Sequence, residues 1–154
     1  MKKIRAKILY LPHYDRAAWG PLSYAHDTDS GFDVRACVPD DGVILAPMER
    51  ARIPLGFCLQ LEPGYGCTVR NRSGSGMKGI IMPNGIGTVD NGYTGEVSML
   101  LLNASGAPYR IGRGAKIGQI VIEPVYRAEF EEVGSLDGFE STSRGAGGFG
   151  STGE

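Results

Sequence analysis

One stretch decides the fold class of this chain, and it reads Arg52-Ile53-Pro54-Leu55-Gly56-Phe57-Cys58-Leu59-Gln60-Leu61. Apolar side chains occupy every second position from Ile53 to Leu61, which is the period of a β-strand rather than of a helix. Because proline donates no ladder hydrogen bond, Pro54 predicts a sheet edge or a bulge within the run. The stretch therefore predicts extended structure with one buried face.

The same period recurs along most of the chain. Further strands are predicted at Lys3–Leu9, Phe32–Val38, Val43–Ala46, Gly66–Arg72, Gly79–Met82, Glu96–Leu102, Lys116–Val125 and Glu129–Val133. Turn-forming residues separate them, as in Pro83-Asn84-Gly85. No long amphipathic helix is visible, and at most one helical turn fits around Ser75–Lys78. Many short strands with turns between them indicate an all-β sandwich or barrel.

Two segments depart from this pattern. Met99-Leu100-Leu101-Leu102 is apolar on both faces, so we expect a strand buried on both sides, with another subunit as one candidate cover. The residues from Ser141 to Gly153 show no period and are rich in glycine, so they cannot build a core of their own. We therefore expect a β-domain over residues 1–140 and a flexible segment over residues 141–154.

Composition and charge narrow the class of protein. A length of 154 residues fits one domain, and a net charge of -1 offers no basic excess for nucleic acid. No signal peptide and no apolar run of transmembrane length are visible, so we expect a cytoplasmic protein without a membrane partner. The three cysteines lack metal-ligand spacing and are expected to be free thiols. His13 and His26 have no evident partner and are expected at the surface.

The segment Gly87–Glu96 carries the candidate catalytic group. Its Asp90-Asn91-Gly92 is a turn signal, and the simpler interpretation is that Asp90 caps a hairpin turn. The alternative is a carboxylate on a rigid turn that can take a proton from water. Tyr93 is then either a half-exposed strand aromatic or a flat wall beside a ligand.

Three further polar positions could bind phosphate or metal. Arg72-Ser73-Gly74 combines a forked donor, a hydroxyl and accessible backbone amides, although such residues also commonly end a strand in a turn. Gln119 shares a strand face with Ile117 and Val121, where its amide needs either a backbone partner or a ligand phosphate. Asp33 could cap a loop or hold a metal-bound water.

The glycine-rich C-terminal run begins at Arg144 and ends in Ser151-Thr152-Gly153. A disordered tail is the commoner interpretation of such a terminus. Here an arginine fork, glycine amides, two hydroxyls and the ring of Phe149 could instead hold phosphates and stack on a base. The run is not a P-loop, because it lacks the Gly-Lys-Ser/Thr ending and a following helix.

Five segments, in this order, resemble the motifs of the trimeric dUTPase family. They are Ser30–Ala36, Asn71–Gly74, Gly87–Val97, Lys116–Val121 and Arg144–Gly153. The resemblance implies a jelly-roll-like β subunit with a mobile C-terminal arm, assembled as a homotrimer with three active sites shared between subunits. It also implies hydrolysis of dUTP to dUMP and pyrophosphate with Mg²⁺, which limits uracil in DNA and supplies dUMP for thymidylate synthesis.

The resemblance also implies roles for individual residues. Asp90 orients the water that attacks the α-phosphate in line, and Tyr93 packs under the deoxyribose, where it excludes a 2′-hydroxyl. Asp33 lies near the Mg²⁺ through water, and Arg144 closes over the phosphates while Phe149 stacks on uracil. The other residues placed against the substrate are Arg72, Ser73, Gly74, Asn84, Gly87, Thr88, Val89, Met99, Gln119, Gly150, Ser151 and Thr152. Such a reaction needs a positioned water molecule and neutralisation of the negative charge on the phosphates. Mg²⁺ together with Arg72 and Arg144 would neutralise that charge.

The chain departs from the family pattern at Gly92, where many relatives carry an acidic residue, and at Thr94, where many carry arginine. Two rival functions remain. A dCTP deaminase looks similar in fold and in its Arg-Ser stretch, but it is not expected to end in this glycine-rich run. A nucleotide-sensing trimer without catalysis is disfavoured by the presence of Asp90, Arg72 and the tail.

Overall fold

The computed structural model describes residues 3–147. Within that part the strands are β1 (Ala6–Tyr10), β2 (Gly31–Arg35), β3 (Val43–Leu45), β4 (Arg50–Pro54), β5 (Phe57–Leu61), β6 (Tyr65–Asn71), β7 (Ile80–Ile81), β8 (Gly87–Val89), β9 (Ser98–Asn103), β10 (Tyr109–Ile111) and β11 (Lys116–Pro124). The helical turns are α1 (Arg16–Trp19), α2 (Ser73–Gly76) and η1 (Leu136–Gly138). The predicted all-β class is confirmed. No helix in the described part has both the length and the apolar character needed to cross a membrane.

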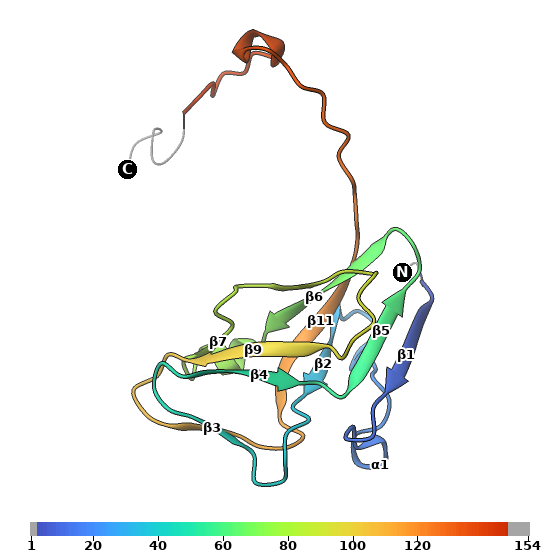
Figure 1. Cartoon of the computed structure of the whole chain (residues 1–154), viewed down its shortest axis with the longest axis vertical. Coiled ribbons are helices and arrows are strands. Elements are labelled where there is room, and N and C mark those ends of the chain that lie inside the picture. The colour runs from blue at the N-terminus through green and yellow to red at the C-terminus, as the bar shows by residue number, and fades with distance from the viewer. Residues whose placement is uncertain (1–2, 148–154) are drawn as a thin grey trace.

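Antiparallel pairing joins these strands into sheets (Figure 1). The largest has the order β2-β11-β6-β8, and a second has the order β4-β9-β7. Two ribbons, β1-β5 and β10-β3, extend the arrangement. The two larger sheets pack closely, since a Cβ added to Gly118 of β11 would lie 2.5 Å from the sulfur of Met99 on β9.

The core lies between the sheets and is filled by alternating residues. Ile53, Leu55 and Phe57 are at most 1% exposed, and Val69 and Ile120 face them from the largest sheet. Burial of a side chain of this size stabilises the fold by about 1.5–3 kcal/mol. The buried face predicted for the run Arg52–Leu61 is confirmed.

The run Arg52–Leu61 is nevertheless not one strand. It breaks after Pro54, so that β4 pairs with β9 while β5 pairs with β1. Gly56 lies at the break with a φ of 76°, and a Cβ there would be 2.5 Å from Cys37 Sγ. The alternation does not reveal the break, because Leu55 and Phe57 still face the core on either side of it.

The structure differs from the sequence-based expectations in three other respects. Residues 129–133 form no strand, and they belong to an exposed stretch that leaves the body after β11 (Figure 1). Their alternation finds no partner strand, and an unpaired extended segment makes no ladder. The short strands β8 and β10 were missed, because three residues carry too little period to detect. The single helical turn occurs at Ser73–Gly76, two residues earlier than expected.

The apolar strand β9 has two unlike faces in the single chain. Met99 and Leu101 are buried at 0% and 1% exposure, whereas Leu100 and Leu102 remain partly exposed. The second face therefore still has apolar surface that a neighbouring subunit could cover. Its burial on both sides stays a prediction.

Gly56→Ala is expected to lower the free energy of unfolding more than Gly64→Ala. Both glycines have positive φ, 76° and 87°, and alanine there costs about 1–3 kcal/mol of backbone strain at each. Only at Gly56 does the methyl group also meet other atoms, since nothing lies within 4 Å at Gly64. Overpacking adds about 1–3 kcal/mol. Urea unfolding measures the difference, and equal destabilisation would contradict the close packing at the break.

Candidate active site

Asp90 and Tyr93 lie in one turn directly after β8. The Tyr93 N–H donates to the Asp90 carbonyl at 2.9 Å and closes that turn. Both side chains are exposed, and with Thr88 and Val89 they line a hollow of about 250 Å³. The Asp90 carboxylate makes no hydrogen bond or ion pair with any residue between 3 and 147, so within that part it does not cap the turn.

Side chains hold this turn at both ends, and backbone bonds of Val97 with Leu55 and Phe57 add to them at the second end. At one end Asn91 Oδ1 accepts the N–H of Leu61 at 2.8 Å, and its Nδ2 donates to the Glu62 carbonyl at 3.3 Å. At the other end Glu96 Oε1 accepts the N–H of Gly56 at 2.8 Å. The turn is thus fixed to both ends of β5.

Asn84 and the residues of β8 lie before this turn. Asn84 is exposed between β7 and β8, and its backbone carbonyl accepts the Ile86 N–H at 2.8 Å. Gly87, Thr88 and Val89 pair with β6 only, so β8 is an edge strand of its sheet. Half of the backbone groups of an edge strand point away from its partner and can bind a ligand.

Asp33 and two cations form the second polar group. Its Oδ1 lies 3.1 Å from Arg72 Nε, and its Oδ2 lies 2.9 Å from Lys116 Nζ. Gln119 is the ladder partner of Asp33 on one side and of Arg70 on the other. The register therefore brings together Asp33 of β2, Gln119 of β11 and Arg72, the residue that follows β6. Lys116 was given no role from the sequence, because nothing in its local pattern shows that it reaches Asp33.

Ser73 and Gly74 follow Arg72 in the single turn of α2. Both are exposed, and the Arg72 carbonyl accepts the N–H groups of Ser75 and Gly76 at 3.0 and 3.1 Å. The Ser73 hydroxyl makes no hydrogen bond to the described residues. Arginine, hydroxyl and backbone thus stand side by side at the end of β6.

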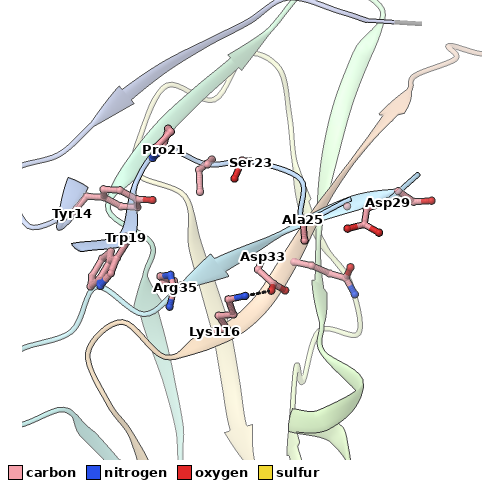
Figure 2. Close-up of a pocket in the computed structure, with 13 residues that line it drawn as sticks. Tyr14, Trp19, Pro21, Ser23, Ala25, Asp29, Asp33, Arg35 and Lys116 are labelled. Atoms are coloured by element: carbon pink, nitrogen blue, oxygen red, sulfur yellow. Dashed lines mark ion pairs between the residues drawn. The ribbon is translucent and has the colours of Figure 1, made fainter. Parts of the chain in front are cut away.

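A larger cavity of about 380 Å³ opens beside Asp33 (Figure 2). Asp33, Arg35 and Lys116 lie along its floor, and the loop that carries Pro21 and Ser23 forms the opposite wall. The segment Tyr14–Asp29 had no predicted role, and the structure shows that it encloses this cavity.

The two hollows are separate in space within the single chain. No described residue lines both, so Asp90 and Tyr93 open on one hollow while Asp33 and Gln119 open on the other. Met99 lies in neither and is completely buried, so its expected substrate contact stays a prediction. Arg144 is exposed in the C-terminal stretch, where its Nε donates to the Gly147 carbonyl at 2.9 Å. Phe149, Gly150, Ser151 and Thr152 lie outside the described residues.

His13 corrects one expectation from the sequence. It was expected to lack a partner, yet its Nε2 lies 2.7 Å from Glu96 Oε1. The two residues are far apart in the chain, so no local pattern could have revealed the contact. His26 is exposed, as expected.

Two of the three thiols are poor nucleophiles. All three cysteines are free, and burial raises the pKa of Cys37 and of Cys67 to about 11. Both therefore stay protonated near neutral pH and react poorly. No group of three or more His, Cys, Asp or Glu side chains within the described residues could hold a metal ion.

Comparisons with known proteins agree with one another. A family model described as dUTPase matches residues 18–153. The chain is 44% identical over 146 residues to a deoxyuridine 5'-triphosphate nucleotidohydrolase of Methylocella silvestris, covering 93% of this chain and 88% of that one. It is similar to the dUTPase of Staphylococcus bacteriophage 80alpha solved with dUPNHPP, at a TM-score of 0.82 and 25% identity over 97% of this chain and 99% of that one. A dUTPase variant from phage phi11 of S. aureus, described with a structural Mg(II) ion, matches at a TM-score of 0.75 and 23% identity over 89% and 99% of the two chains.

Mg²⁺ alone is expected to bind the protein weakly, in the millimolar range or above. One carboxylate, Asp33, already faces two cations, and Mg²⁺ typically needs phosphate oxygens beside one or two carboxylates. Calorimetric titration should show saturable Mg²⁺ binding only when a non-hydrolysable triphosphate nucleotide is present. Tight Mg²⁺ binding without nucleotide that disappears in Asp33→Asn would contradict this expectation.

Proposed function

This chain belongs to the dUTPase family and hydrolyses dUTP to dUMP and pyrophosphate, and we propose that its two hollows are the two halves of one active site. One half, around Asp90 and Tyr93, takes the water, the sugar and the base. The other half, around Asp33, Arg72 and Gln119, takes the triphosphate. The observation that carries the proposal is that no described residue lines both hollows.

Asp90 is the group that orients the attacking water. Its carboxylate is exposed and unpaired within the described residues, so it is available to accept a proton. The turn that carries it is tethered to β5 at both ends, through Asn91 and Glu96. A fixed base can hold water in line with the α-phosphorus, and positioning is the main demand of this chemistry.

Base and sugar are read beside Asp90. The free edge of β8, from Gly87 to Val89, and the exposed Asn84 present backbone and amide groups that match the donors and acceptors of uracil. Tyr93 supplies a flat wall for the deoxyribose. A 2′-hydroxyl against that wall meets a ring and not a hydrogen-bond partner, which disfavours ribonucleotides.

The phosphates are held in the second half. Arg72, Ser73, Gly74 and Gln119 offer a guanidinium, a hydroxyl, backbone amides and a side-chain amide, which are the donors that phosphate oxygens accept. In the free chain the single carboxylate of Asp33 contacts both Arg72 and Lys116, so one positive charge is left over for a phosphate. A bound triphosphate would compete with Asp33 for Arg72.

Members of the dUTPase family typically use Mg²⁺, and the donor set fits it. Asp33 and Asp29 are the carboxylates that line this cavity, and so few carboxylates suit an ion held mainly by phosphate oxygens and water. Bound there, the ion would neutralise charge on the phosphates. Asp33 would hold it through water, while Arg72 and Arg144 would neutralise the remaining oxygens.

A homotrimer joins the halves. Facing subunits of a closed ring can place the Asp90 hollow of one chain against the Asp33 group of another. The partly exposed Leu100 and Leu102 of β9 offer apolar surface for such an interface. The C-terminal arm, with Arg144, Phe149, Gly150, Ser151 and Thr152, would then close over the bound nucleotide.

Asp90→Asn is expected to lower kcat for dUTP by about a hundredfold to ten-thousandfold, because the amide cannot take a proton from water. Binding of a non-hydrolysable dUTP analogue should be unchanged. Asp41→Asn is the matched control, since Asp41 is an exposed turn carboxylate outside both hollows. Pyrophosphate release measures turnover, and near-normal turnover of Asp90→Asn would sink the assignment.

UTP is expected to be a poor substrate, with a specificity constant about a hundredfold below that of dUTP. Tyr93→Ala should reduce the ratio of the specificity constant for dUTP to that for UTP, because it removes the ring that packs beside C2′. The ratio is measured by pyrophosphate release with each nucleotide. Equal specificity constants for the two nucleotides in the unaltered enzyme would refute the role of Tyr93, and release of ammonia from dCTP would favour a deaminase.

A further inference from the structure

His13 contacts Glu96, three residues after the Asp90–Tyr93 turn. It belongs to the segment between β1 and α1, and its ring Nε2 lies 2.7 Å from Glu96 Oε1. A carboxylate oxygen only accepts, so the ring nitrogen is the donor. The His13 and Glu96 side chains are 40% and 26% exposed, so water screens the contact only in part.

The backbone around His13 is itself fixed. The His13 carbonyl accepts Arg113 Nη2 at 2.8 Å, and the Leu11 N–H donates to the Gly56 carbonyl at 2.8 Å. The N–H of the same Gly56 donates to Glu96 Oε1. One carboxylate oxygen therefore receives two donors, one from the segment that follows β1 and one from the strand break at Gly56.

Glu96 connects this unit to the reacting turn. Its backbone carbonyl accepts the Tyr93 hydroxyl at 2.9 Å. The Tyr93 ring also folds over Gly95, where an added Cβ would lie 2.6 Å from the tyrosine oxygen. The location of the Tyr93 ring is consequently tied to the location of Glu96, only three residues away from it.

We infer that His13 is a positioning residue for dUTP hydrolysis: through Glu96 it holds the Tyr93 ring and the Asp90 turn in a single arrangement. This inference rests on the roles proposed for Asp90 and Tyr93. Without the ring donor, the Glu96 carboxylate keeps only the Gly56 N–H. The backbone of Val97 stays bound to Leu55 and Phe57, so the freedom that is gained lies on the Tyr93 side of Glu96 and not beyond it. Small displacements of positioning groups reduce rates strongly, so both turnover and the selection against a 2′-hydroxyl decline.

The test compares kcat/KM for dUTP and for UTP in the full-length enzyme with Mg²⁺. His13→Phe keeps a ring but has no donor, and it should lower kcat/KM for dUTP about tenfold and narrow the preference for dUTP over UTP. His13→Gln places an amide N–H at a similar distance from Glu96. It should retain most of the kcat/KM for dUTP and most of the preference for dUTP over UTP. Gln60→Phe is the control, since the Gln60 side chain is exposed, makes no hydrogen bond to the described residues and lines neither hollow.

The preference for dUTP over UTP does not depend on the fraction of enzyme that is folded, so it separates positioning from loss of stability. An unchanged preference in His13→Phe would overturn the inference, even if total activity falls. Equal impairment in His13→Gln and His13→Phe would also overturn it, because the donor would then be irrelevant. If Asp90→Asn is fully active, the proposed function fails; if Asp90→Asn is inactive and only the His13 result is negative, this inference alone fails.

Discussion

The register of β11 between β2 and β6 is the constraint on which the rest of the structure depends. It places Gln119 opposite Asp33 and Arg70 on one face, and Ile120 opposite Phe32 and Val69 on the other. Because side chains alternate, a slip of one residue would turn the polar group into the core and Ile120 into water. Burial of the apolar residues therefore also fixes the polar group around Asp33 that we propose binds the phosphates.

The other half depends on a break rather than on a ladder. Gly56 interrupts the longest alternating run, and its N–H is thereby left to bind Glu96. That bond and the Asn91 amide attach the Asp90 turn to β5, although the residues of the turn lie in neither β8 nor β9. The Asp90 carboxylate, proposed as the catalytic base, can stay exposed and unpaired within the described residues because neighbouring groups, and not Asp90 itself, hold the turn.

Much of this could be predicted from the sequence, and the failures have physical causes. The alternation from Ile53 to Leu61 correctly predicted a buried face, because burial is what produces alternation. It could not show the break at Gly56, since Leu55 and Phe57 on either side of the glycine both point into the core. The ordered motifs led to the right family. The contacts of Lys116 with Asp33 and of His13 with Glu96 were missed, because tertiary proximity leaves no local pattern.

The central claim is that one chain carries two half-sites which a neighbour must complete. It is tested most directly by mixing two inactive variants, Asp90→Asn and Arg72→Ala, refolded together in equal amounts. If the halves come from different subunits, random mixing gives about one site in four with both groups intact, since two independent choices each succeed half the time. The account predicts recovery of about a quarter of the activity of the unaltered enzyme. No recovery in mixed trimers confirmed by native mass measurement would contradict it.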